Sequence, residues 1–149
     1  SRVTLRECEQ MPLLRAVIDE SLRLRAPIWA VARNVVERDE IMGREIAAGA
    51  IAGPAPYLIH RHPDFWEQPE VFRPARFLGA GPKHEYAYLP FSRGPRMCIG
   101  AAFALYELQI ALATLLQRVE VFPVDPQSPE PRARVTLAPA QPIRLLVRR

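Results

Sequence analysis

The sequence predicts an α+β segment built from two main helices, several short antiparallel strands and long ordered loops. Residues 10–24 and 98–118 repeat apolar side chains close to the helical period. Short β-prone runs bounded by glycine and proline lie between these helices and after the second one. The chain has 149 residues, 49% hydrophobic and 24% charged, which excludes disorder, collagen and coiled coil and suffices for one globular domain.

The first helix is amphipathic, with acids and arginines between its apolar positions. Pro27 is expected to end it, because proline lacks a backbone N–H and disfavours helical backbone at the preceding residue. Residues 31–36 and 51–59 are β-prone, and turn-forming pairs at residues 42–43 and 48–49 separate them. We therefore expect two or three short strands in this region.

A proline-rich stretch from residue 60 to residue 94 is predicted to be an ordered loop, with room for one helical turn at residues 64–67. The second helix, residues 98–118, is apolar nearly all round, which is typical of a helix covered on most faces in a larger protein. The tail is expected to contain strands at residues 119–122 and 143–147, joined by proline-rich loops.

Composition narrows the class of partner. The formal net charge is +4, and only Lys83 among the twenty basic residues is a lysine. The arginines are scattered and often have acids nearby, so we expect no nucleic-acid partner. Cys8 and Cys98 make no disulfide framework and favour a reduced intracellular setting. The longest apolar stretch is broken by Tyr106 and Glu107, so no membrane segment is expected.

Cys98 is the strongest candidate for chemistry. It lies in the sequence FSRGPRMCIG, residues 91–100, at the start of the second helix, where unpaired backbone N–H groups and the helix dipole favour a thiolate. A thiolate there can be a nucleophile, a redox centre or a metal ligand, and the alternative is a buried cysteine used as a small apolar residue. His60 and His62 have the spacing of a metal pair, but loop positions explain them and no further ligand cluster supports a site.

Three motifs point to one family. Residues 91–100 match F-x-x-G-x-R-x-C-x-G at every fixed position, Glu20-Ser21-Leu22-Arg23 matches E-x-x-R, and residues 72–77 contain P-x-R-F. Together they resemble the cytochrome P450 family, over essentially the whole chain. The resemblance implies that residues 1–149 are a C-terminal haem-binding segment with no complete second domain, the α+β part of a mostly α fold. Departures are small: Ser92 replaces a frequent glycine and Ala75 a frequent glutamate.

The resemblance implies a haem b site. Cys98 would be the iron ligand, and its thiolate would favour cleavage of the O–O bond. Arg96 and Arg33 would bind the haem propionates, for which planar guanidinium groups are suited. Phe91 would shield the cysteine, although an ordinary core aromatic is an equally good interpretation, and Gly100 would allow close approach of the backbone to the porphyrin.

Glu20 and Arg23 are three residues apart on the first helix, so both leave the same face and can form an ion pair. Taken alone, such a pair is a surface bridge of little energetic value. The resemblance adds Arg76 and implies a buried network of three side chains that supports the cysteine loop. We therefore interpret these residues as structural.

Substrate contacts are expected at two apolar segments that resemble pocket-lining segments of the family. They contain Ile28 and Trp29, and Ala138 and Pro139. Both segments suit an apolar organic substrate, and the alternative is that they pack in the core.

The resemblance also implies an enzyme class for the parent protein. It would insert one oxygen atom of O2 into its substrate, with electrons from NAD(P)H delivered by a ferredoxin or a flavin reductase. The family's proton-delivery helix lies upstream of the matched region, so no catalytic residue is identified and we expect little or no activity of the chain alone. The alternative is a non-enzymatic, truncated remnant that binds haem weakly or not at all.

Two further expectations concern origin. Ser1 in place of methionine, followed almost at once by a helix, suggests a chain cut from something longer. The use of arginine for lysine suggests a GC-rich, bacterial source and hence a cytoplasmic enzyme.

Overall fold

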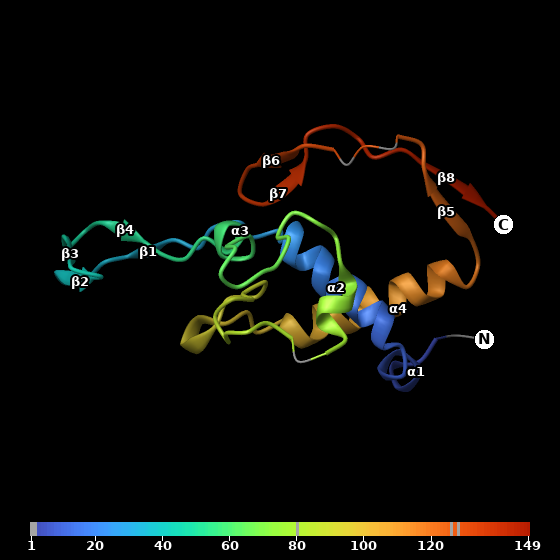
Figure 1. The fold of residues 1–149 in the computed structure, drawn as a ribbon, viewed down its shortest axis with the longest axis horizontal. Coiled ribbons are helices and arrows are strands. Elements are labelled where there is room, and N and C mark those ends of the chain that lie inside the picture. Colours follow the sequence, from blue (N-terminus) through green and yellow to red (C-terminus); the bar gives the residue numbers. More distant parts are fainter. Residues whose placement is uncertain (1–2, 80, 126, 128) are drawn as a thin grey trace.

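The computed structural model describes residues 3–79, 81–125, 127 and 129–149. Two helices, α2 (Pro12–Leu24) and α4 (Ala101–Leu116), cross and contact each other at the centre of the molecule (Figure 1). Short two-stranded antiparallel ribbons extend away from this centre. The predicted α+β class, with two main helices and short antiparallel strands, is confirmed.

A separate short helix, α1 (Leu5–Glu9), precedes α2 and contacts both α2 and α4. The Thr4 hydroxyl accepts from the N–H of Glu7 (3.4 Å), and the Glu7 carboxylate accepts from the N–H of Thr4 (2.8 Å). This capping box pairs two N–H groups that lie at the beginning of the helix. Helix α2 begins at Pro12 and not at residue 10, because proline fits the first helical position, where its missing N–H costs nothing.

The buried face of α2 carries charge. Asp19, Glu20 and Arg23 are buried beside Ile18, whereas Leu13 is 60% exposed. The amphipathic pattern therefore locates the helix correctly but does not identify its buried face. The buried charges are stable there because they bond to one another and to backbone carbonyls, as described below.

The first ribbons form an arm. Strand β1 (Arg33–Asn34) pairs with β4 (Ile51–Ala52), and β2 (Asp39–Ile41) pairs with β3 (Arg44–Ile46). The predicted turn at residues 42–43 joins β2 and β3, with φ of 51° at Met42 and 76° at Gly43. Both residues are left-handed, as a tight hairpin requires. Within the strand expected at residues 31–36, two residues, Arg33–Asn34, form β1.

The strand expected at residues 51–59 is wrong beyond Ala52. Gly53 approaches the backbone of Val31 so closely that a Cβ would collide with the Val31 carbonyl oxygen. The chain then turns into the short helix α3 (Pro56–Ile59), which begins at a proline. Two prolines within five residues remove the N–H groups that a longer strand would need.

The predicted loop from residue 60 to residue 94 is mostly irregular. The helical turn expected at residues 64–67 is displaced: the turn is closed by a bond from the Trp66 N–H to the His62 carbonyl (3.0 Å) and is not a helix. Two 3-10 turns follow, η1 (Pro74–Phe77), which packs on α2, and η2 (Gly94–Arg96).

Helix α4 begins at Ala101, three residues later than expected, because the cysteine loop continues through Gly100. Its apolar side chains are largely uncovered: Phe103 is 72% and Leu116 is 58% exposed, while Gln109 and Ala113 are buried. None of the described helices is long and apolar enough to span a bilayer.

The tail forms two more ribbons. Strand β5 (Glu120–Pro123) pairs with β8 (Leu145–Arg148), close to the predicted positions. The expectation of loops alone between them is wrong, since β6 (Pro131–Ala133) pairs with β7 (Leu137–Pro139). Prolines occur in this ribbon because an edge strand tolerates a residue without an N–H.

Candidate functional site

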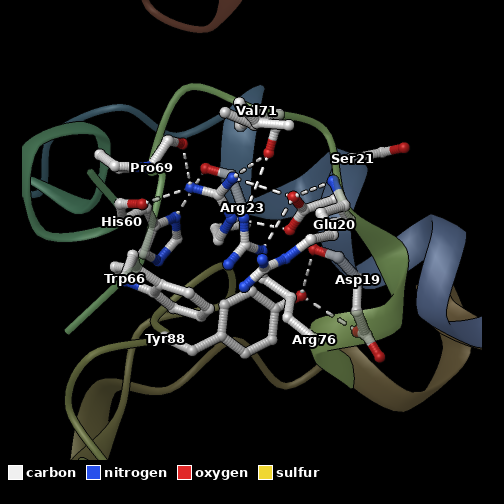
Figure 2. A network of polar contacts seen from close by, with 12 residues as sticks. Asp19, Glu20, Ser21, Arg23, His60, Trp66, Pro69, Val71, Arg76 and Tyr88 are labelled. Atoms are coloured by element: carbon white, nitrogen blue, oxygen red, sulfur yellow. Dashed lines mark hydrogen bonds and ion pairs between the residues drawn. The ribbon is translucent and has the colours of Figure 1, made fainter. Parts of the chain in front are cut away.

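Two neighbouring arrangements contain most of the predicted site residues. One is a buried polar network around Glu20, and the other is a pocket beside Cys98. Figure 2 shows the network, in which Glu20, Arg23 and Arg76 converge from α2 and η1 above the rings of Trp66 and Tyr88.

Arg23 is fully buried and uses its guanidinium in two directions. Its Nε and Nη2 donate to the two carboxylate oxygens of Glu20, at 2.7 and 2.9 Å. Its remaining donors reach three backbone carbonyls, those of His60 (2.7 Å), Pro69 (2.7 Å) and Val71 (3.3 Å). Arg23 therefore ties α2 to the loop that follows α3, a task that suits a planar fork with five N–H groups.

Glu20 collects donors from a second segment. Its Oε1 accepts from Nε of Arg76 (3.1 Å) and from the backbone N–H of Arg73 (2.7 Å). Burial raises the pKa of the Glu20 carboxyl, but the hydrogen bonds from Arg23, Arg73 and Arg76 outweigh it, so the pKa is lowered overall. Glu20 is therefore the buried anion shared by two guanidinium groups.

Trp66 forms the floor of the network. Its ring centroid lies 5.1 Å from the guanidinium carbon of Arg23 and 5.8 Å from that of Arg76, within the range of cation–π attraction. Its Nε1–H donates to the carbonyl of Ala87 (3.3 Å). The role of Trp66 could not be predicted from the sequence, because nothing in a loop of mixed composition distinguishes a buried tryptophan from an exposed one.

His60 was interpreted above as a loop position, and its burial was not predicted. It is fully buried, its Nδ1 lies 3.1 Å from the Arg23 carbonyl oxygen, and its Nε2 lies 2.7 Å from the backbone nitrogen of Leu89. Burial, with the nearby charges of Arg23 and Arg61, lowers its pKa to about 4. Both ring nitrogens are thus engaged within the protein, and the interpretation of His60 as a plain loop position is incomplete.

The pocket beside Cys98 has a volume of about 370 Å³ and mostly apolar walls. It is lined by residues of α2, the following segment, the cysteine loop and α4: Leu22, Pro27, Ile28, Val31, Arg33, Leu89, Pro90, Phe91, Ser92, Arg96, Cys98, Ala104 and Leu108. The predicted residues Ile28, Arg33, Phe91, Arg96 and Cys98 are therefore brought together around one cavity, although up to 70 sequence positions separate them.

The cysteine loop is held by its own backbone. The Cys98 N–H donates to the Phe91 carbonyl (2.9 Å), and the Met97 N–H donates to the Gly94 carbonyl (3.0 Å). Ser92 has a φ of 61°, a left-handed conformation that favours glycine, which is the residue the family resemblance leads one to expect there. The Cys98 side chain is consequently presented at the surface of the pocket and is exposed.

Gly100 lies beside the sulfur. A Cβ added to it would come to 3.9 Å from the Cys98 Sγ, an ordinary van der Waals distance. The protein atoms alone therefore do not demand glycine at this position, and the expected reason for it, close approach to a porphyrin, stays a prediction.

The remaining predicted contacts lie elsewhere. Trp29 donates from Nε1 to the Arg134 carbonyl (2.7 Å), which joins its segment to the β6–β7 hairpin. Ala138 and Pro139 line a second cavity of about 250 Å³ that does not include Cys98. The Leu137 N–H donates to the Pro27 carbonyl (2.7 Å) and so links β7 to the rim of the first pocket.

The Cys98 pocket fits haem chemically. It offers one exposed thiol, which can serve as a soft iron ligand, and apolar walls for a porphyrin face. Arg33 and Arg96 supply cationic groups suited to carboxylates on the same cavity.

Comparison with known proteins identifies the relatives of this arrangement. The family model described as Cytochrome P450 matches residues 1–147. Cytochrome P450 4d2 of Drosophila melanogaster is 41% identical over 128 residues, which are 85% of this chain and 26% of that protein. Cytochrome P450 4A14 of Rattus norvegicus is 38% identical over 148 residues, 99% of this chain and 29% of that protein.

Solved structures of cytochromes P450 are also similar to this chain. The heme domain of cytochrome P450DA superposes with a TM-score of 0.88 at 28% identity, covering 99% of this chain and 33% of that one. The retinoic acid-bound cyanobacterial CYP120A1 gives a TM-score of 0.89 at 27% identity, covering 99% of this chain and 34% of that one.

These relatives correct one expectation. The expectation of a bacterial, cytoplasmic protein is wrong, because similar curated proteins come from fly, rat and human. The cytoplasmic location was inferred from that source and is corrected with it. Arginine and lysine carry the same charge, so a preference for one of them does not by itself determine lineage or compartment.

Proposed function

Because this chain belongs to the cytochrome P450 family, we propose that its Cys98 pocket holds haem b, with the Cys98 sulfur as the protein ligand of the iron. The family is that of the haem-thiolate monooxygenases. The chain spans 26% and 29% of the length of the first two curated relatives described above, so the activity of the whole protein is also proposed here. We assign residues 1–149 as the C-terminal haem-binding segment.

The observation that carries the proposal is the convergence of one thiol and two guanidinium groups on a single apolar cavity. Arg33 and Arg96 would each bind a haem propionate, since a guanidinium can donate two parallel hydrogen bonds to a carboxylate. Phe91 contributes both a wall of the cavity and the carbonyl that accepts from the Cys98 N–H, so it would orient the ligand and help to shield it from water when haem is bound. Gly100 would leave room for the porphyrin beside the sulfur.

The polar network around Glu20 supports the Cys98 pocket through helix α2, which contributes to both. Glu20, Arg23 and Arg76 hold α2 and η1 together, and α2 also supplies Leu22 to the pocket wall. These residues would act by keeping the cavity in shape and not by touching substrate.

For the whole protein we propose insertion of one oxygen atom of O2 into an apolar organic substrate, with electrons from NAD(P)H through a ferredoxin or flavin reductase. Haem, when bound, supplies the oxygen activation. Ile28 lines the Cys98 pocket and would contact substrate there. Trp29, Ala138 and Pro139 would line the approach to it, because the β6–β7 hairpin adjoins the segment of Pro27.

The test is the absorbance spectrum of the full chain with added haem, reduced and exposed to carbon monoxide. We expect a red-shifted Soret band, which reports a thiolate ligand, in the wild-type chain. Cys98→Ser should lose it, and Cys8→Ala, which changes the only other cysteine, should keep it. A folded wild-type chain without the band, or a band that survives Cys98→Ser, contradicts the proposal. The former result favours the remnant that binds no haem.

The propionate assignment has its own measurement. Arg96→Gln and Arg33→Gln should each raise the rate of haem transfer to an acceptor protein by about tenfold, the effect of a lost charge-assisted hydrogen bond. Arg38→Gln is the matched control, because Arg38 pairs with Glu45 on the exposed hairpin, outside the pocket. Equal rates in all three variants would remove Arg33 and Arg96 from the site.

A further inference from the structure

We infer that His60 is a positioning residue for the cysteine loop, acting as a neutral imidazole that donates from Nδ1 to α2 and accepts at Nε2 from Leu89. The contacts of His60 with Arg23 and Leu89 do not depend on the proposed function. The consequence for the iron ligand rests on the proposed function of Cys98.

The two partners of His60 determine its tautomer. Nδ1 lies 3.1 Å from the Arg23 carbonyl oxygen, which can only accept, so Nδ1 must carry the proton. Nε2 lies 2.7 Å from the Leu89 nitrogen, whose N–H can only donate, so Nε2 must be the unprotonated acceptor. In a protonated ring, the Nε2–H would point at the Leu89 N–H, and two donors would face each other.

The position of His60 is fixed on its other sides as well. Its own carbonyl accepts from Nη1 of Arg23 (2.7 Å), and its ring packs at 5.4 Å between centroids against Tyr88, with a tilt of 37°. The hydroxyl of Tyr88 donates to the carboxylate of Asp19 on α2 (3.0 Å). His60 and Tyr88 therefore join the same helix to the chain at residues 88–89 (Figure 2).

Leu89 leads directly to the cysteine loop. Its carbonyl accepts from the Ser92 N–H (3.2 Å), which closes a turn through Phe91. The Phe91 carbonyl in turn accepts from the Cys98 N–H (2.9 Å). A short series of backbone bonds thus runs from the His60 ring to the amide of the proposed ligand. Leu89 and Phe91 also line the Cys98 pocket, so a shift of this segment would change the cavity.

Two substitutions separate the two ring nitrogens. In His60→Gln the side-chain carbonyl oxygen can occupy the place of Nε2 and accept from Leu89. In His60→Asn the side-chain amide nitrogen can occupy the place of Nδ1 and donate to Arg23, but nothing remains to accept from Leu89. His62→Gln is the matched control, because His62 is two residues away and its side chain is 51% exposed.

The first readout is amide hydrogen exchange of the peptide containing Leu89, measured by mass spectrometry on the full chain without haem. We expect exchange at Leu89 to rise about tenfold in His60→Asn, the effect of one lost hydrogen bond, and to stay within about threefold of wild type in His60→Gln and His62→Gln. The exchange rates of peptides from α4 in each variant serve to correct for differences in global stability. Equal exchange in the Asn and Gln variants overturns the inference.

The second readout needs no variant of His60. Long-range proton–nitrogen spectra of the wild-type chain at pH 7 should show one neutral imidazole protonated at Nδ1 among its three histidines. Assignment uses His62→Gln and His84→Gln, each of which removes one other signal. A His60 ring protonated at Nε2, or charged at pH 7, overturns the inference even if the His60 variants do not fold.

The third readout connects His60 to the iron ligand. In the haem-loaded chain, His60→Asn should lower the fraction of the carbon monoxide complex that has the red-shifted Soret band, and His60→Gln should restore it. A restored exchange pattern without a restored band would overturn the consequence for Cys98. If the wild-type chain shows no band at all, the proposed function fails, whereas the exchange and tautomer results still decide the role of His60.

Discussion

Nε of Arg76 donates to Oε1 of Glu20 across 3.1 Å, although 56 positions separate the two residues in the chain. The same oxygen accepts from Arg23 and from the Arg73 N–H. One buried carboxylate therefore joins α2 to η1, and its removal should affect the whole fold and not one surface.

Replacing the carboxylate with an amide tests this relationship. Glu20→Gln keeps the size of the side chain but leaves Arg23 and Arg76 buried without a counter-charge. We expect the free energy of unfolding to fall by about 3–5 kcal/mol, measured by urea denaturation. Glu45→Gln removes an ion pair to Arg38 whose side chains are 59% and 74% exposed, and should cost less than about 1 kcal/mol. Similar losses in the two variants would mean that Glu20 is not a buried counter-ion.

The guanidinium shape of Arg23 is required as well as its charge. Arg23→Lys retains the cation, but a single nitrogen cannot reach both Glu20 and the carbonyls of His60, Pro69 and Val71. We expect a loss of at least about 3 kcal/mol in the same denaturation experiment, because buried acceptors are left unpaired. Arg15→Lys, at a pair with Asp19 where Arg15 is 44% exposed, is the control and should lose less than about 1 kcal/mol. Equal effects would contradict the argument.

Acid should destabilise the chain through His60. Burial, with the charges of Arg23 and Arg61 nearby, lowers the folded-state pKa from 6.5 to about 4. Between those values the unfolded chain binds a proton that the folded chain does not bind. The free energy of unfolding should therefore fall by about 3 kcal/mol as the pH drops from 6.5 to 4.

The comparison with His60→Gln isolates this effect, because the carboxyl groups titrate in both proteins. Urea denaturation at a series of pH values should show an extra acid-side loss in wild type that the Gln variant lacks. Parallel curves over this range would show that His60 has the same pKa in the folded and unfolded states.

The exposed apolar side chains of α4 should drive association. Ile99 just before the helix and Phe103 and Leu116 within it are all more than half exposed, at 104%, 72% and 58%. Exposed apolar side chains of this size promote contact between molecules. We expect the average mass of the chain, measured by sedimentation velocity, to rise with concentration, and Phe103→Asp with Leu116→Glu to reduce it.

Val135→Glu is the control for this experiment, because Val135 is 93% exposed but lies in the β6–β7 turn, away from α4. It should leave the association unchanged. A wild-type chain that sediments as a monomer at every concentration would disprove the prediction.

Local features could be predicted from the sequence because they depend on neighbouring residues. The period of apolar side chains located α2 and α4, the Met42-Gly43 pair located the β2–β3 turn, and β-prone runs located β5 and β8. The errors are local too. Helix α3 was missed because a short apolar run suits either a strand or a helix, and the β6–β7 hairpin was missed because its prolines suggested a loop.

The motifs likewise indicated the family, and comparison confirmed it. They could not show that Ile28 and Arg33 share a cavity with Cys98 while Ala138 and Pro139 line another. Such groupings depend on how distant segments pack.

The sequence by itself determined where the two main helices and the β2–β3 turn lie and which family the chain resembles, since backbone preference and motif spacing depend on adjacent residues. Only the tertiary structure decided that His60 is buried and which backbone groups pair with Glu20 and Arg23. His60 has partners 29 and 37 positions away, and Glu20 has one 56 positions away. A charged or polar side chain is buried only when the folded chain supplies its hydrogen-bond partners, and those partners come from parts of the chain that no local pattern connects.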